Sequence, residues 1–199
     1  MRGVVLITGV MASGKSTVAQ GLASRLPRAA HVRGDVFRRM VVSGRADCLP
    51  DGFGGPGGSG GASGSAPGAS GPAPAVSVEA REQLLLRYRL SAATADAYAD
   101  AGFTAVVQDV VLGEDLAGWV GMVRTRPLYV VVLAPDVRAV AAREAGRAKS
   151  GYGAWSVEEL DRWLRERTPR IGLWLDTSGM TSEETVEKIL TERQRAGVE

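Results

Sequence analysis

Residues 9–16, Gly-Val-Met-Ala-Ser-Gly-Lys-Ser, have the spacing of a loop that wraps a phosphate group. Glycine at both ends lets backbone N–H groups turn toward an anion, and the helix expected after the loop adds partial positive charge. In this pattern Lys15 bridges the β- and γ-phosphates of a nucleotide, and the Ser16 hydroxyl coordinates Mg²⁺. A glycine-rich turn that merely precedes a helix is the competing interpretation. We expect ATP to be bound by one continuous segment, namely Gly9, Val10, Met11, Ala12, Ser13, Gly14, Lys15, Ser16 and Thr17.

Two aspartates follow two other apolar segments. Asp109 ends the run Val-Val-Gln-Asp, where an acid suits a Walker B role and holds Mg²⁺ directly or through water. A turn or helix-cap aspartate is the alternative. Asp35 follows residues 29–33, where a carboxylate can accept the proton of a substrate hydroxyl during phosphoryl transfer. Asp35 also precedes a helical segment, so an N-cap is the competing interpretation, and the two roles are compatible.

Arg143 and Arg147 are four residues apart in a helical segment and therefore share one face. Glycines nearby favour a mobile lid whose arginines stabilise charge on the transferring phosphoryl group. The alternative is a solvated basic face, and the sequence does not choose between the two arginines. Weaker candidates for phosphate or substrate contacts are Arg38, Arg39 and Lys149.

Apolar segments and helically spaced segments alternate along the chain, which predicts a parallel sheet with right-handed crossovers and helices on both faces. Strands are expected at 3–8, 29–33, 103–107, 128–133 and 171–176. Helices are expected at 15–26, 36–42, 78–101, 114–123, 136–146, 156–167 and 182–193, the last two starting with capping boxes at Ser156 and Ser182. The candidate residues then meet at the carboxyl ends of the strands, where ligands bind in such sheets.

The composition narrows the classes of protein. The chain has 199 residues, which suits a single domain over 1–199, and a Gly/Ser/Ala/Pro-rich insert at 52–75 reads as a flexible loop. One cysteine excludes an intrachain disulfide, and a net charge of +2 gives no bulk attraction for nucleic acid. The sequence shows no signal peptide and no membrane-spanning apolar run, so we expect a cytoplasmic enzyme.

Four motifs together resemble the small P-loop kinases of the chloramphenicol phosphotransferase-like group, and more distantly adenylylsulfate kinases, gluconate kinases and zeta-type toxins. They are residues 9–16, Gly34-Asp35, residues 108–113, and Asp136 followed by Arg143-Glu144 and Arg147. The resemblance covers nearly the whole chain outside 52–75. It implies a P-loop NTPase fold with a five-stranded parallel sheet, the acceptor base at Asp35 and the ATP-phosphate role at Lys15. The insert lies where such kinases build part of their acceptor site, so the resemblance does not carry over a substrate.

The leading hypothesis is an ATP- and Mg²⁺-dependent kinase that phosphorylates a hydroxyl of a small molecule. A nucleoside or nucleotide kinase is a second hypothesis, and a regulatory ATPase or switch without an acceptor is a third. Polynucleotide phosphorylation has little support, because no basic and aromatic stripe for a single strand is visible. The sequence leaves the acceptor, the nucleotide preference and the oligomeric state open.

Overall fold

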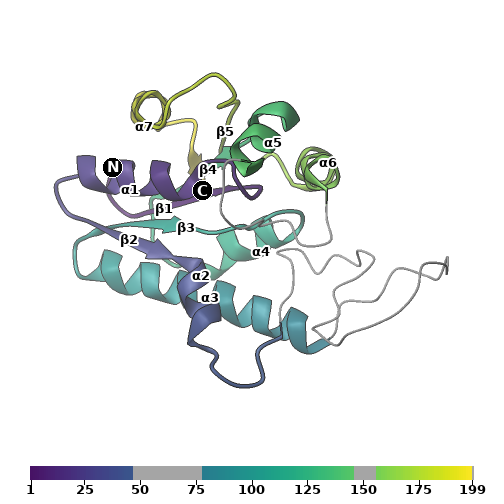
Figure 1. Ribbon diagram of the computed structural model, residues 1–199. Coiled ribbons are helices and arrows are strands. Elements are labelled where there is room, and N and C mark those ends of the chain that lie inside the picture. The colour runs from purple at the N-terminus through teal and green to yellow at the C-terminus, as the bar shows by residue number, and fades with distance from the viewer. Residues whose placement is uncertain (47–77, 146–155, 199) are drawn as a thin grey trace.

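The computed structural model describes residues 1–46, 78–145 and 156–198, and its centre is a parallel sheet (Figure 1). The strands lie in the order β2-β3-β1-β4-β5, and every neighbouring pair among these five is parallel. Their bounds are β1 Val4–Gly9, β2 Ala29–Arg33, β3 Thr104–Gln108, β4 Leu128–Leu133 and β5 Leu173–Leu175. β1 and β3 are buried at every position, as expected for central strands covered on both faces. The predicted five-stranded parallel sheet is confirmed.

The end of the chain differs from the prediction. The last helix, α7 (Ser182–Thr191), stops two residues early, and β6 (Gly197–Val198) then pairs antiparallel with β4. Val130 N–H donates to the carbonyl of Ala196 at 2.8 Å, and the Ala196 side chain is fully buried. A two-residue strand has no alternation of apolar and polar positions, so the sequence pattern could not reveal it.

Helices cover both faces of the sheet, as predicted. α1 (Lys15–Arg25) and α7 pack together on one face, where they enclose one of two apolar clusters. The second cluster lies on the other face under α3 (Val78–Asp100) and α4 (Asp115–Met122), and it extends to α5 (Val137–Ala145) and α6 (Val157–Arg167). The short α2 (Gly34–Met40) packs on α3, and Figure 1 shows the two side by side below the sheet.

Hydrogen bonds from nearby side chains determine where α6 and α7 begin. Ser156 caps α6 as predicted: its hydroxyl accepts from Glu159 N–H at 3.1 Å, and the Glu159 carboxylate accepts from Ser156 N–H at 2.8 Å. The prediction for α7 was wrong by one residue, because Thr181 rather than Ser182 forms the same box, with Glu184. Thr181 also precedes a glutamate by three residues, and a glutamate completes a capping box better than the Thr185 that was expected to do so.

The insert at 52–75 lies outside the described residues, so its flexible character stays a prediction. None of the helices in the described ranges combines the length and apolarity that crossing a bilayer requires.

Asp96 of α3 ties this helix to the segment that leads into β4. Its carboxylate accepts from the N–H groups of Arg124 and Thr125 at 3.1 and 2.9 Å and from the Thr125 hydroxyl at 2.7 Å. Burial by itself raises the pKa of Asp96, but the hydrogen bonds from Thr125 and Arg124 outweigh burial and hold the pKa below 3.8. The charged form is therefore the one that this turn stabilises.

Asp96→Ala should lower the free energy of unfolding by about 2 to 3 kcal/mol, because it removes several hydrogen bonds to one charged group. Urea denaturation at pH 7 measures the loss. Asp100→Ala is the matched control, since Asp100 also binds Arg124 but is exposed, and its removal should cost at most about 1 kcal/mol. Because the pKa of Asp96 is lowered in the folded state, the stabilisation is fully present above the ordinary aspartate pKa and is lost as the pH falls through the lowered one. A difference between wild type and Asp96→Ala that stayed constant throughout this acidification would contradict the assignment.

Candidate functional site

The loop between β1 and α1 has the backbone conformation that wraps an anion. Gly9, Ala12 and Gly14 have φ angles of 143°, 57° and 95°. A side chain on Gly9 would overlap the carbonyl of Leu133, so this position requires glycine. Nothing lies within 4 Å of the place where a Cβ of Gly14 would stand, so the loop is open on that side. No side chain caps α1, and its first turn carries no acid, so its N-terminal N–H groups suit a negatively charged ligand.

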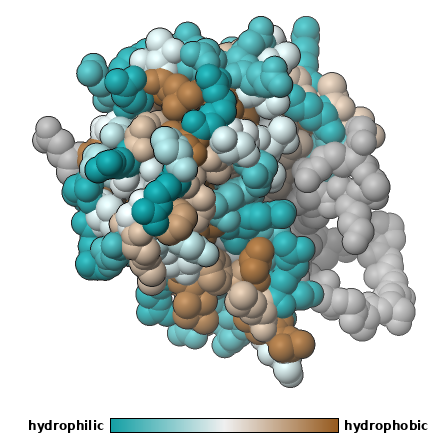
Figure 2. All heavy atoms as spheres, turned by 90° about the vertical axis from the view of Figure 1, so that its left-hand side faces the viewer, coloured by the Kyte–Doolittle hydropathy of each residue, from teal (hydrophilic) through white to brown (hydrophobic). Residues whose placement is uncertain are grey.

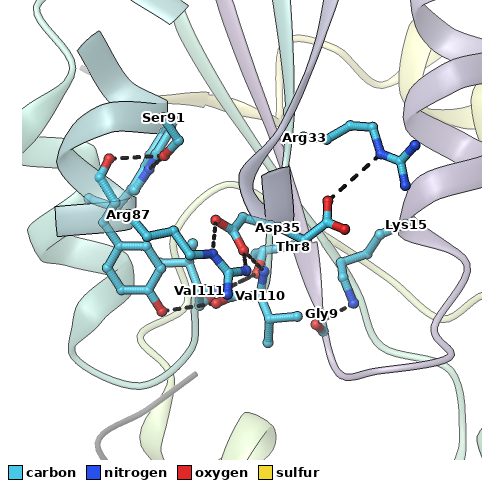
Figure 3. A network of polar contacts seen from close by, with 12 residues as sticks. Thr8, Gly9, Lys15, Arg33, Asp35, Arg87, Ser91, Val110 and Val111 are labelled. Atoms are coloured by element: carbon cyan, nitrogen blue, oxygen red, sulfur yellow. Dashed lines mark hydrogen bonds and ion pairs between the residues drawn. The ribbon is translucent and has the colours of Figure 1, made fainter. Parts of the chain in front are cut away.

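Lys15 lies inside this loop and only 6% of it is exposed. Its Nζ donates to the carbonyls of Gly9 and Val10 at 2.9 and 2.6 Å, as Figure 3 shows for Gly9. A buried ammonium needs such partners, because an unpaired charge is costly away from water. The loop therefore holds a positive charge at its centre, where the phosphate tail of a nucleotide would need it.

A cavity of about 470 Å³ lies in front of this loop. It brings together most of the residues predicted from the sequence: Met11, Ala12, Gly14, Lys15, Ser16, Thr17, Asp35, Asp109 and Arg143 line it. The other predicted loop residues, Gly9, Val10 and Ser13, support the loop from behind; Ser13 and Val10 are buried. Arg147 and Lys149 lie outside the described residues. Gln108 and Val110, from the motif at 108–113, also line the cavity, together with Arg33 and Arg87, which the sequence had not singled out.

Asp35 faces this cavity from the first turn of α2. One carboxylate oxygen, Oδ2, accepts from Arg39 Nη2 at 2.8 Å. The other, Oδ1, is buried and lies 3.8 Å from Arg33 Nε, which is too far for a hydrogen bond (Figure 3). Oδ1 accepts no hydrogen bond from the described residues. The alternative role of Asp35 as an N-cap is wrong, because Arg33 occupies that position and no side chain caps α2.

Asp109 is fully buried and forms an ion pair that the sequence did not suggest. Its Oδ2 accepts from Arg87 Nε at 3.0 Å, and its Oδ1 pairs with Arg87 Nη2 and accepts from Val110 N–H at 2.7 Å. A Cβ on Gly34 would overlap Asp109 Oδ2, so the start of α2 must be a glycine. Burial lowers the pKa of Arg87, yet a guanidinium stays protonated in proteins. Figure 3 shows Arg87 entering from α3, opposite Asp35 and Lys15.

One sequence signal could have identified Arg87. It stands three residues after Leu84 and four before Ser91, both buried, and so lies on the inward face of α3. A charged residue on a buried helix face is unusual unless it is paired, so this position called for an acidic partner. The sequence did not identify the partner, Asp109, which lies 22 residues further along the chain.

Arg143 of α5 is tied to the loop after β5. Its Nη2 donates to the carbonyl of Thr177 at 2.8 Å, which holds the side chain across one edge of the cavity. In the same loop Asp176 accepts from Ser178 N–H at 2.9 Å and from the Ser178 hydroxyl, and these bonds lower the pKa of Asp176. Through Arg143, the loop after β5 thus borders the site.

The described residues fit a phosphate ligand better than they fit a metal ion held by protein alone. They contain no cluster of three His, Cys, Asp or Glu side chains that could hold a metal. Both oxygens of Asp109 are engaged by Arg87 and by the backbone, so a direct metal bond from Asp109 would require Arg87 to give way. Ser16 is exposed in the cavity. Magnesium commonly takes few protein ligands and several from phosphates and water, and this donor set is compatible with that pattern.

Comparison with known proteins identifies the family. Residues 4–170 match a family described as an AAA domain. The chain belongs to this family. The match spans the loop at 9–16, Asp35, Asp109 and Arg143, so every predicted site residue in the described ranges lies within the AAA domain. No curated protein sequence matches the chain significantly.

Solved structures show the same fold. A sugar kinase from Janibacter sp. HTCC2649 is 20% identical, with a TM-score of 0.66 over 98% of this chain and 96% of that one. The tunicamycin resistance protein of Deinococcus radiodurans is 14% identical, with a TM-score of 0.63 over 100% and 99%. The APS kinase of Mycobacterium tuberculosis, in complex with AMPPNP and APS, is 17% identical, with a TM-score of 0.60 over 97% and 98%. At these identities the likeness establishes the architecture.

Replacing Arg87 should destabilise the protein strongly, because it leaves the carboxylate of Asp109 buried without its partner. We expect Arg87→Met to cost about 3 to 5 kcal/mol of unfolding free energy in urea denaturation. The double variant Arg87→Met/Asp109→Asn removes the charge as well as the pair and should recover a substantial part of that loss. Arg89→Met, two residues further along α3 at an exposed position, serves as the control. If the double variant were no more stable than Arg87→Met, the lost unfolding free energy would not come from the unpaired carboxylate of Asp109.

Proposed function

We propose that this chain is an ATP-dependent kinase that transfers the γ-phosphoryl group to a hydroxyl of a small molecule. The observation that carries the proposal is the placement of two groups in one cavity. Lys15 sits within a loop shaped for phosphate, and the carboxylate of Asp35, whose side chain is 40% exposed, lines the same cavity. A nucleotide-binding loop facing a carboxylate is what transfer to a hydroxyl requires.

The position of each group in the cavity indicates what it does in the reaction. The backbone of residues 9–14 and the Lys15 ammonium hold the phosphate tail of ATP, and the Asp35 carboxylate accepts the hydrogen of the acceptor hydroxyl. The acceptor oxygen forms a bond to the γ-phosphorus, the bond from that phosphorus to the bridging oxygen of ADP breaks, and the hydroxyl proton passes to Asp35. Magnesium, held by Ser16 and by the phosphates, would neutralise charge on them. Arg143 lies where it can approach the phosphate chain, and for Arg147 the same role remains a prediction from sequence.

The comparisons are consistent with this activity. The sugar kinase and the APS kinase are proteins of the same architecture that phosphorylate small molecules, and the latter was solved with AMPPNP and APS. Small-molecule acceptors as different as these show that one architecture serves several substrates, so the acceptor of this chain has to be inferred from its own residues.

Lys15→Met should abolish measurable Mg-ATP binding, because it removes the ammonium while keeping the apolar stem that packs in the loop. Isothermal titration calorimetry with Mg-AMPPNP measures the effect. Lys188→Met is the control, because Lys188 lies on α7 and pairs with Glu192, away from the cavity. Unchanged affinity in Lys15→Met would remove the basis for the phosphate assignment.

Asp35→Asn should lower acceptor-dependent turnover by about 10²- to 10⁴-fold, the usual contribution of a general base, with the affinity for Mg-AMPPNP retained. Coupled ADP release, confirmed by the mass increase of the acceptor, provides the measurement. Asp100→Asn, an exposed acid of α3, controls for loss of a surface charge.

A regulatory ATPase predicts the opposite result, namely slow hydrolysis that needs no acceptor and is indifferent to Asp35→Asn. Nucleosides in the acceptor panel test whether a nucleoside kinase describes the chain better.

A further inference from the structure

A second, smaller cavity lies between α2 and α3, beside the phosphate cavity. Its volume is about 150 Å³, and most of its walls are apolar. The lining consists of Phe37, Arg38, Met40, Val41, Ala46, Ala80, Gln83, Leu84, Leu86, Arg87 and Leu90. Neither the AAA family match nor the predicted phosphate contacts account for an apolar cavity here.

The two helices each present one face to this cavity. Phe37 and Met40 of α2 are spaced i, i+3, and Val41 follows at the C-cap; Ala80, Leu84 and Arg87 of α3 are spaced i, i+4, i+7. Apolar surface continues around the opening, since Met40, Leu86 and Leu90 are 65%, 41% and 40% exposed. Figure 2 shows brown, apolar side chains toward the lower end of the molecule, the level at which α2 and α3 lie in Figure 1.

Arg87 belongs to the walls of both this cavity and the phosphate cavity. Its guanidinium is held on Asp109, on the phosphate side. Asp35 lies on α2 only two residues before Phe37, so the proposed base and the apolar wall belong to the same short helix. The Asp35 carboxylate and the apolar cavity therefore lie on neighbouring parts of one helix, with Arg87 in the wall between the two cavities.

The volume limits what can enter. An apolar protein cavity of about 150 Å³ holds a molecule the size of benzene. A sugar ring would place several hydroxyls against Leu84, Phe37 and Ala80, where they would lose their hydrogen bonds to water. The cavity thus favours one compact apolar group and disfavours a polyol.

We propose that this cavity binds the apolar part of the acceptor, and that the preferred substrates are alcohols carrying a single aromatic or alicyclic ring rather than sugars. This inference rests on the proposed kinase activity. Arg87 forms the boundary between the two halves of the substrate site, with the phosphoryl group on one side and the ring on the other.

The test compares two acceptor series in the ADP-release assay, with product mass as confirmation. One series is benzyl alcohol, 2-phenylethanol and cyclohexylmethanol, and the other is glycerol, glucose and gluconate. We expect kcat/KM to be roughly tenfold or more higher for the ring alcohols, the usual effect of burying one apolar ring. Turnover with the polyols that equals or exceeds turnover with the ring alcohols would overturn the inference and leave the kinase assignment standing.

Variants locate the effect in the cavity. Ala80→Leu narrows it and should raise KM for ring alcohols about tenfold, with the affinity for Mg-AMPPNP unchanged. Ala93→Leu, on an exposed position of the same helix, is the matched control. If Ala80→Leu does not fold, Leu90→Gln makes a half-exposed wall polar and should reduce the preference for ring alcohols. Unchanged KM in a folded variant would show that the ring does not enter this cavity, whether because another part of the protein fills it or because the acceptor binds elsewhere.

A binding measurement separates failure of this inference from failure of the proposed function. Saturation-transfer NMR with 2-phenylethanol should show binding to the wild-type chain and loss of binding in Ala80→Leu. Such binding without turnover of any alcohol would uphold the cavity assignment and refute the kinase. Turnover of polyols without 2-phenylethanol binding would uphold the kinase and refute the cavity assignment.

Discussion

The ion pair between Arg87 and Asp109 holds the site together, because three elements meet at it. Asp109 follows β3, Arg87 comes from the middle of α3, and the first residue of α2, Gly34, lies directly against the carboxylate. The pair therefore joins the helix layer below the sheet to the carboxyl edge of the sheet. Because α2 starts against this pair, the position of Asp35 relative to the phosphate-binding loop depends on it.

The same pair divides the space around the site by polarity. On one side lie the loop at 9–14, Lys15 and a cavity lined by charged and polar groups. On the other side lies the smaller cavity with leucine and phenylalanine walls. A guanidinium suits this boundary, since its planar end binds a carboxylate at two points while its stem contacts apolar side chains. Phosphoryl transfer and acceptor selection would then be carried out by neighbouring but chemically distinct surfaces.

Membership of the AAA domain family and the likeness to solved kinases concern the architecture and the phosphate loop. The same architecture is found in a sugar kinase and in an APS kinase, so the architecture by itself does not select a substrate. In this chain, substrate selection would depend on side chains of α2 and α3 rather than on the sheet.

Local features of the sequence determined much of this protein. The glycine pattern at 9–16, the apolar strands and the capping box at Ser156 each depend on residues close together in the chain, so short-range steric and hydrogen-bonding rules predict them. The strand-end rule also brought Lys15, Asp35 and Asp109 to one edge. Tertiary structure alone decided that Asp109 pairs with Arg87, that Gly34 must be small, that β6 returns to β4, and that α2 and α3 enclose an apolar cavity. Each of these depends on contacts between segments distant in sequence, whose relative position is settled only when the helices pack on the sheet.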